Sequence, residues 1–501
     1  MKKLYFALVL ILSAAACAFS EETVSPDSPQ IVYNGRISWR NPKSPAFSYP
    51  GTSAEFRFSG SSVKMLAKPG SGYFMVEFDN LAPFKINFSE NDSVATLASG
   101  LDSNEHRVRV TYAIEGYQKR PEFRGFLLSD GGKMLNAPKR SSRRIEFIGN
   151  SITCGYGIEA DSAREKFTYA TENHYYTFAA RTARALGAEY NVVARSGIGM
   201  YRNYGGPAEG TPDGCLPALY DRTLFYDADE KWDFSSFQPD VVCVNLGTND
   251  MSVNKGDSVR YENAALQFAK RLRGYYPNAK IVMLTGSMLT GKNLGIVQRA
   301  LDRVAASMRK DGDNAFYRFD MSPQDGSLGY GAGYHPSMRQ AEKMANELTT
   351  YLKSITNWKS DMEIIQKDGF NLVRQADGPD LGYSPTSGVK IIEVDGKAFK
   401  SFDGSDTLLP YEDWRLPMEE RAADLASRLS VDEIAGLMLY SIQNKLPMPN
   451  DTYGGKPFAE SGMKAYDLSD AQIKFLTDDN LRHVLVSTVE SPETAARWNN
   501  K

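Results

Sequence analysis

Gly149-Asn150-Ser151-Ile152-Thr153-Cys154-Gly155-Tyr156-Gly157 follows directly after the apolar run Ile145-Glu146-Phe147-Ile148. A β-branched and aromatic run that ends at Gly-Asn-Ser indicates a buried strand followed by a turn, which presents a hydroxyl above the edge of a sheet. Ser151 is therefore the candidate nucleophile. The same turn is also compatible with an Asx or Ser turn that caps the next helix, so the motif needs support from the rest of the chain.

Two later stretches supply that support, because a second apolar run, 240–250, ends in Gly247-Thr-Asn249-Asp250, and Gly333-Tyr-His335-Pro-Ser337 places a histidine before a helix. Between residues 143 and 358, apolar runs alternate with helical patterns. We predict strands at 145–148, 190–194, 241–246, 280–285 and 315–319, and helices at 174–187, 260–275, 295–310 and 338–354. Apolar strands that are each followed by a helix indicate a parallel sheet covered on both faces. Such α/β sheets build their sites at the carboxyl ends of the strands.

The residues at these strand ends fit acyl transfer, which needs a nucleophile, a base and hydrogen-bond donors for an oxyanion. We expect Ser151 to attack and His335 to accept and return the proton. The oxyanion is expected between the backbone N–H groups of Ser151 and Gly199 and the side-chain amide of Asn249. Alone, His335 would be a helix-entry residue, but the other three histidines of the chain lie in less suitable places.

A third member that orients His335 is less clear. The residues two and three positions before the histidine are Gly333 and Ala332, which offer no side-chain acceptor. We therefore expect a Ser-His dyad in which a backbone carbonyl orients the imidazole, with Asp325 as a fallback third member. We expect no cofactor.

The N-terminus predicts export. Residues 1–20 carry Lys2 and Lys3, then an apolar stretch and small residues, which is typical of a secretory signal peptide and too short for a membrane span. We expect a periplasmic or extracellular protein; a lipid anchor at Cys17 is the second choice, because the residues before it lack a large apolar side chain. No other stretch is apolar enough to span a bilayer, and the net charge of −3 shows no basic footprint for nucleic acid.

The regions on either side of the α/β part have different sequence patterns. Short alternating segments between residues 27 and 138, such as Tyr73-Phe-Met-Val-Glu-Phe78, predict a β-sandwich of jelly-roll type. We place the α/β domain at 142–357, a linker at 358–408 and a third region at 409–501.

The third region and the cysteines give smaller expectations. Ser430-x-x-Glu433 predicts a capping box that opens a helix. After the signal peptide only Cys154, Cys215 and Cys243 remain, which excludes a disulfide scaffold. A single bridge between Cys154 and Cys215 is possible, whereas Cys243 lies in an apolar strand and is expected to be a core residue.

Four blocks resemble the SGNH (GDSL-type) hydrolases: Gly149-Asn150-Ser151, Ser196-Gly-Ile-Gly199, Gly247-Thr-Asn249-Asp250 and His335. The longer stretches of sequence around these blocks, together with the jelly roll expected before them, resemble carbohydrate esterase family 2 over roughly residues 30–355. That resemblance implies removal of acetyl groups from plant polysaccharides such as xylan or glucomannan, or from acetylated sugars, without a metal. Members often carry Asp and Trp just before the histidine, and Tyr334 would replace the tryptophan as a sugar-stacking face or would simply pack.

The last region resembles the beginning of glycoside hydrolase family 3 through Leu409-Pro-Tyr-Glu-Asp-Trp-Arg-Leu-Pro417 and residues 491–500. The resemblance implies the incomplete start of a (β/α)₈ barrel without its catalytic carboxylates, so glycosidase activity cannot be claimed for this chain. Hydrolysis of an aryl glycoside would revive that alternative. Related sequences often carry a calcium-like loop here. In this chain Asp406 occupies the position at which a calcium loop needs glycine. Leu409 occupies a position at which the loop needs an oxygen ligand, so we expect no calcium.

The leading hypothesis is thus an exported acetylesterase whose partner is an acetylated polysaccharide or oligosaccharide. One alternative is a carbohydrate-binding protein with a decayed esterase site, motivated by the missing carboxylate. Another is a lipase or thioesterase of the same fold, although no extended apolar flap accompanies the motifs.

Overall fold

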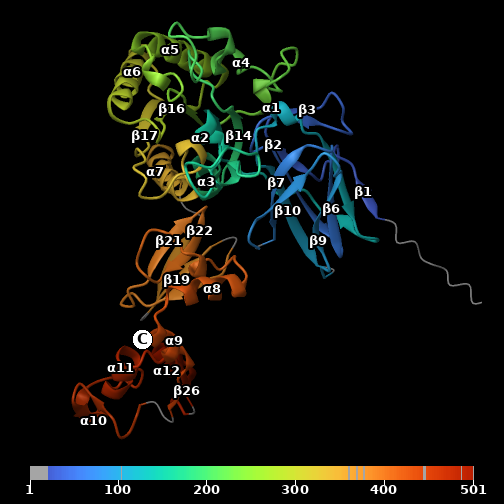
Figure 1. Cartoon of the computed structure of the whole chain (residues 1–501). Coiled ribbons are helices and arrows are strands. Elements are labelled where there is room, and N and C mark those ends of the chain that lie inside the picture. The colour runs from blue at the N-terminus through green and yellow to red at the C-terminus, as the bar shows by residue number, and fades with distance from the viewer. Residues whose placement is uncertain are drawn as a thin grey trace, which may run out of the picture.

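The computed structural model describes residues 21–79, 81–102, 104–358, 362–367, 370–375, 378–443, 447–486 and 488–499. The predicted signal peptide, including Cys17, lies outside the described residues. A sandwich of strands lies beside a helix-covered sheet, and two smaller units follow along the chain (Figure 1).

The N-terminal part is a sandwich of two antiparallel sheets, so the predicted β-sandwich is confirmed. One sheet has the order β1-β11-β6-β9, and the other has the order β12-β5-β10-β7-β8 with β2 on β5. Rings such as Phe56 and Phe126, whose centroids lie 4.1 Å apart, fill the space between the sheets. The strands are β1 (Glu22–Val24), β2 (Val32–Asn34), β3 (Ile37–Ser38), β4 (Ala46–Phe47), β5 (Ser53–Ser59), β6 (Ser62–Ala67), β7 (Gly72–Phe78), β8 (Phe84–Phe88), β9 (Val94–Ser99), β10 (Glu105–Tyr112), β11 (Phe123–Leu128) and β12 (Lys133–Met134), with the one-turn helix α1 (Gly116–Lys119) after β10.

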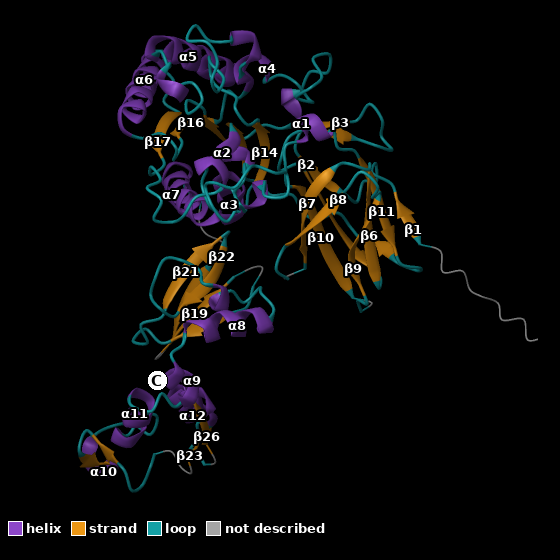
Figure 2. Cartoon of the chain, in the orientation of Figure 1, coloured by secondary structure: helices purple, strands orange, loops and turns teal. Residues whose placement is uncertain are grey.

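The second part is a five-stranded parallel sheet with the order β14-β13-β15-β16-β17, as the apolar runs predict. Helices α3 and α7 pack on one face and α5 and α6 on the other, which gives three layers (Figure 2). The elements are β13 (Arg144–Gly149), α2 (Ser151–Cys154), α3 (Phe178–Ala185), β14 (Glu189–Ala194), α4 (Leu216–Leu219), β15 (Val241–Asn245), α5 (Ser258–Tyr275), β16 (Lys280–Thr285), α6 (Gly291–Lys310), β17 (Phe316–Asp320) and α7 (Met338–Thr356).

One helix starts later than its sequence predicts. The predicted helix 174–187 begins as a 3₁₀ turn, His174–Tyr176, and the α-helix starts only at Phe178. Thr177 separates the two because its extended backbone lets its hydroxyl accept the N–H of Ala180 as an N-cap.

The sandwich is joined to the parallel sheet by a buried ion pair. Arg36, in the turn between β2 and β3, reaches Glu146 in the middle of β13 with an N–O distance of 3.2 Å, and both side chains are fully buried. Glu146 also accepts hydrogen bonds from the hydroxyls of Tyr220 and Tyr276, while Arg36 donates to the carbonyl oxygen of Arg222 at 3.1 Å. A charge from one domain is therefore enclosed by partners from the other.

The segment expected to be a linker, 358–408, is structured in its described residues. It contains five strands: β18 (Glu363–Lys367), β19 (Phe370–Arg374), β20 (Leu381–Tyr383), β21 (Lys390–Val394) and β22 (Lys397–Ser401). Asp395, in the β21–β22 turn, forms ion pairs with Arg181 and Arg184 of α3 at 3.4 and 3.2 Å. Because the strands are short and separated by Gly, Asp, Ser and Pro, their composition resembles that of a linker.

The last region contains two parallel strands, β23 (Tyr440–Gln443) and β26 (His483–Val486). The predicted capping box is confirmed: the Ser430 hydroxyl accepts the Glu433 N–H, and the Glu433 carboxylate accepts the Ser430 N–H. The barrel itself stays a prediction. The remaining elements are α8 (Met418–Arg428), α9 (Val431–Met438), β24 (Thr452–Tyr453), β25 (Lys456–Pro457), α10 (Phe458–Ser461), α11 (Asp470–Thr477) and α12 (Pro492–Asn499).

The structure also bears on the predicted disulfide bridge and on membrane-spanning helices. Cys154, Cys215 and Cys243 are all buried and free, so the bridge considered between Cys154 and Cys215 does not form. Cys154 lies in α2, whereas the thiol of Cys215 faces Asn203 at 3.6 Å. None of the helices in the described ranges combines the length and apolar character that a membrane crossing requires.

Candidate active site

Ser151 lies directly beyond the carboxyl end of β13, as the first residue of α2. Asn150 caps this short helix, because its side-chain oxygen accepts the N–H of Ile152 at 3.0 Å. Gly149 has no room for a side chain, since a Cβ there would lie 2.0 Å from the Thr153 hydroxyl oxygen. The order Gly-Asn-Ser thus has a local cause: a tight strand-to-helix turn that presents the Ser151 hydroxyl at the sheet edge.

The hydroxyl oxygen of Ser151 lies 2.8 Å from Nε2 of His335. The other ring nitrogen, Nδ1, lies 3.0 Å from the carbonyl oxygen of Ala332. That carbonyl can only accept, so Nδ1 carries the proton and Nε2 offers its lone pair to Ser151. The Tyr156 ring packs against the imidazole at a centroid distance of 4.4 Å and limits its rotation.

Asp325, the fallback third member, is engaged elsewhere. Its carboxylate accepts the backbone N–H and the hydroxyl of Ser327 at 2.9 and 2.6 Å, and these hydrogen bonds hold the pKa of the carboxyl below its usual range. Tyr334 is 59% exposed and its ring meets Tyr330 edge-on at 5.4 Å. Its outward ring leaves a free aromatic face one residue from His335.

The three expected oxyanion donors gather at the same edge, but two of them have partners. The Asn249 amide donates one hydrogen to the carbonyl of Ile198 at 2.7 Å, which leaves its second hydrogen available. The only hydrogen of the Gly199 N–H is directed to the side-chain oxygen of Asn203 at 3.0 Å. Gly199 must be glycine, because a Cβ would lie 1.9 Å from the Arg202 carbonyl oxygen.

Asp250 fixes the loop that carries Gly199. Its fully buried carboxylate accepts the backbone N–H groups of Met200, Tyr201 and Arg202 at 3.0, 2.8 and 3.1 Å. Burial raises the pKa of Asp250 to about 6, although the three N–H groups favour the ionised form. The sequence places Asp250 beside Asn249, but nothing in the spacing reveals this role.

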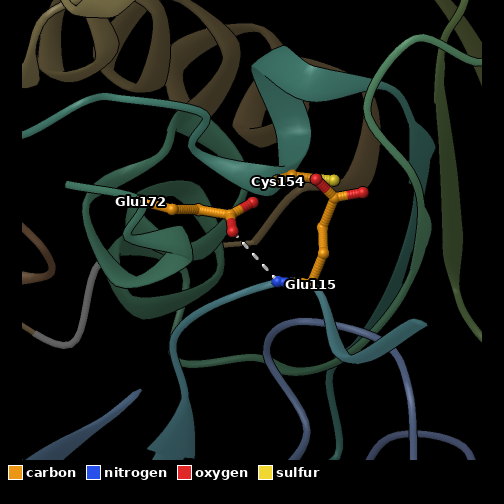
Figure 3. Close-up of side chains that lie close together, drawn as sticks. All are labelled: Glu115, Cys154 and Glu172. Carbon is orange, nitrogen blue, oxygen red and sulfur yellow. Dashed lines mark hydrogen bonds between the residues drawn. The ribbon is translucent and has the colours of Figure 1, made fainter. Parts of the chain in front are cut away.

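A second carboxylate, Glu115, holds the same loop from the sandwich side. Its carboxylate accepts the Ser196 N–H at 2.6 Å, and its own N–H donates to Glu172 at 3.3 Å. Figure 3 shows the Glu115 carboxylate beside the sulfur of Cys154, three residues after Ser151. Burial, followed by the nearby Glu115, raises the pKa of Glu172 well above its usual range. The ligand atoms of the three residues lie within 4.8 Å of one another, but we attribute to them only a link between the domains.

Beside Ser151 lies a very small cavity of about 10 Å³, whose lining includes Ile158, Phe178 and Met344. A volume of about 10–15 Å³ holds roughly one water molecule. This cavity is therefore about the size of one water molecule.

This fold and this site define a GDSL-like, or SGNH, hydrolase. Residues 147–342 match the model of the GDSL-like lipase/acylhydrolase family, and residues 33–138 match the model of the carbohydrate esterase 2 N-terminal domain. A solved family two carbohydrate esterase from Clostridium thermocellum, in complex with cellohexaose, superposes with a TM-score of 0.62 and 37% identity over 66% of this chain and 100% of its own. The chain belongs to carbohydrate esterase family 2, a family of carboxylic ester hydrolases.

Two curated relatives agree with this assignment. The cellulase/esterase CelE of Acetivibrio thermocellus is 37% identical over 344 residues, which are 68% of this chain and 41% of CelE, so the chain spans about two fifths of that relative. An acetylxylan esterase / glucomannan deacetylase of Cellvibrio japonicus is 29% identical over 68% of this chain and 92% of its own length. Separately, a periplasmic β-glucosidase/β-xylosidase of Dickeya chrysanthemi is 36% identical over 121 residues, 23% of this chain and 16% of its own length.

Proposed function

We propose that this chain removes acetyl groups from plant cell-wall polysaccharides, acetylated xylan or glucomannan, through an acyl-Ser151 intermediate. The observation that carries the proposal is the 2.8 Å contact between the Ser151 hydroxyl and Nε2 of His335, with the opposite ring nitrogen held by the Ala332 carbonyl. This intact Ser–His contact supports catalysis over a decayed binding site. The names of the Cellvibrio relative and of the solved esterases support the polysaccharide as partner.

The chemistry follows from these positions. Nε2 of His335 takes the Ser151 proton while the serine oxygen attacks the acetyl carbonyl. The oxyanion is stabilised by the Ser151 N–H, the free amide hydrogen of Asn249 and the Gly199 N–H once it turns from Asn203. As the C–O bond to the sugar breaks, the imidazolium protonates the leaving sugar oxygen, which departs as a hydroxyl. A water that gives a proton to His335 then attacks the acetyl-Ser151 carbonyl, and acetate leaves as Ser151 recovers its proton. Ala332 replaces the aspartate of a triad, since its carbonyl fixes the tautomer without adding charge.

A short acyl group is the expected substrate, because the Cellvibrio relative is an acetylxylan esterase / glucomannan deacetylase. The test is acetate release from an aryl acetate, from acetylated xylan and from acetylated glucomannan, together with hydrolysis of the aryl butyrate and octanoate. We expect acetate esters to be hydrolysed fastest and at least one polymer to be deacetylated. Faster turnover of octanoate would favour a lipase, and polymer binding without acetate release would favour a decayed site.

The proposal includes two further points that rest on sequence. Residues 1–20 support export to the periplasm or the cell exterior. Tyr334 is assigned to the polymer-binding surface, because its exposed ring offers an apolar face to sugar C–H groups.

Replacing the amide donor should slow the chemical step. In Asn249→Ala, kcat for an aryl acetate is expected to fall about 10²- to 10³-fold with a smaller change in KM, as for other oxyanion donors. Steady-state kinetics measures this, with circular dichroism to show that the loop-holding contact to Ile198 is not needed for folding. A kcat within two-fold of the unaltered chain would remove Asn249 from the oxyanion site.

The pH profile should reflect the environment of His335. Burial lowers the pKa of the imidazole below its usual value of about 6.5, although hydrogen bonding to Ala332 acts in the opposite direction. Because the neutral imidazole is the base, kcat/KM should rise with pH through this lowered pKa and be level at neutral pH. We expect the midpoint of the acid limb below pH 6.5, unchanged in His106→Gln. A midpoint above 6.5 would contradict a buried, neutral base.

A further inference from the structure

A second cavity lies between the sandwich and the parallel sheet, away from Ser151. Its volume is about 680 Å³, within the range of about 300–1,000 Å³ that small-molecule sites occupy. Residues of the β2–β3 segment of the sandwich line one side, and residues 223–237 together with the first residues of β13 and β14 line the other. Clefts at domain interfaces of this kind are frequent binding sites.

The cavity and the candidate active site lie at opposite edges of the sheet. Arg144 and Glu189, which line the cavity, are the first residues of β13 and β14, whereas Ser151 follows the last residue of β13. A six-residue strand at about 3.3 Å per residue separates the two edges by about 20 Å. A ligand in the cavity therefore does not touch the reacting atoms.

Aromatic rings form much of the wall. Trp39 is 40% exposed, and its ring meets Tyr33 edge-on at 5.1 Å with an interplanar angle of 82°. Trp232 and Phe237 contribute from the other domain. Partly exposed indole and phenol rings present flat apolar faces that suit the C–H faces of a sugar ring.

The charged groups of the wall largely neutralise one another. Arg140 pairs with Glu189 at 3.1 Å, and Arg40 pairs with Glu230 at 3.3 Å. Ion pairs of this kind leave polar groups at the cavity wall without an excess of positive or negative charge. Such a wall favours a neutral ligand with many hydroxyl groups over an anion.

Two buried hydrogen-bond donors in the lining have no protein partner. Asn191 is 2% exposed; its side-chain oxygen accepts the N–H of Gly35 at 2.9 Å, which fixes the amide orientation and leaves Nδ2 without an acceptor. The indole N–H of Trp232 is also buried and unpaired. Because buried polar groups are nearly always satisfied, each of these two donors is available to an acceptor that the chain does not supply.

From these observations we infer that the cavity is a second, non-catalytic site for a neutral oligosaccharide. The sugar faces would stack on Trp39 and Trp232, and ring or hydroxyl oxygens would accept from Nδ2 of Asn191 and from the Trp232 indole N–H. The site would hold one stretch of a polymer while Ser151 acts on another. Binding itself does not depend on the proposed esterase activity.

Calorimetric titration of the full chain with xylohexaose, mannohexaose and cellohexaose tests the inference. At least one is expected to bind, and Trp39→Ala should weaken that binding about ten-fold, the loss of roughly 1.4 kcal/mol of stacking. Phe402→Ala, which removes an exposed ring outside the cavity, serves as the matched control and should bind like the unaltered chain. Hydrolysis of an aryl acetate should be equal in all three proteins.

Trp232→Phe keeps an aromatic ring but removes the N–H donor and part of the indole face, so it should weaken binding several-fold and serves as the test if Trp39→Ala fails to fold. Equal affinity in the Trp39, Trp232 and unaltered proteins would place the sugar elsewhere, such as at the active site, and overturn the inference. Absence of binding by all three hexasaccharides would overturn it as well. If the unaltered chain does not hydrolyse an aryl acetate, this counts against the proposed function alone, because calorimetric titration still measures the binding of sugar to the cavity.

Discussion

Ser151→Ala and His335→Ala are each expected to lower kcat for an aryl acetate by about 10⁴-fold or more, and the double variant should be no slower than either single one. The reason is that the two side chains act as one unit across a 2.8 Å contact, so removing either leaves only the residual effect of binding and of the oxyanion donors. Steady-state turnover with active-site titration by an aryl ester measures this.

Asp325→Asn is the matched control for these variants, because it removes the fallback carboxylate while the Ser327 contacts that bind it lie apart from His335. Its turnover should stay within about two-fold of the unaltered chain. A loss near that of His335→Ala would mean that Asp325 reaches the imidazole during catalysis and that a triad, not a dyad, operates.

Arg36→Ala is expected to reduce the free energy of unfolding by about 3–5 kcal/mol, because Glu146 then stays buried without its counter-charge. Urea unfolding followed by fluorescence and by circular dichroism measures the change. The double variant Arg36→Met/Glu146→Leu should recover most of the loss, since apolar side chains of similar size need no partner.

Lys43→Ala is the control for this experiment, because it removes an ion pair with Asp27 whose side chains are 70% and 41% exposed. Its unfolding midpoint should not move measurably, as is usual for surface pairs. If Arg36→Ala behaved like Lys43→Ala, the two domains would not depend on the buried pair.

Local patterns predict most of the catalytic domain. The apolar runs before Ser151 and Asn249 are long enough to specify strands, and a parallel sheet brings their carboxyl ends together whatever the helices between them do. His335 could be found because few histidines compete for the role. A backbone carbonyl as the partner of the imidazole could be expected, because glycine and alanine leave it no nearby side-chain acceptor; that the carbonyl is that of Ala332 comes from the structure.

Contacts between domains could not be predicted in this way. Glu115 and Arg36 lie in short turns of the sandwich, and their partners Ser196 and Glu146 are distant in sequence, so neither periodicity nor spacing marks them. The helix α3 starts at Phe178 and not at the predicted residue 174. The sequence pattern does not distinguish a 3₁₀ turn from an α-helix when an N-capping threonine lies between them. The β18–β22 segment resembles a linker in sequence because its strands are too short to show alternation.

The buried Arg36 also implies an order of folding. The sandwich ends near residue 134, and all of its strands pair within that stretch, so it can fold before the second domain does. The enclosure of Arg36 is complete only when the second domain has folded, because Glu146, Tyr220 and Tyr276 all belong to that domain. A sandwich that folds first keeps this arginine in water until the second domain closes over it, which a positively charged, well-hydrated side chain allows and a hydrophobic one in the same turn would not.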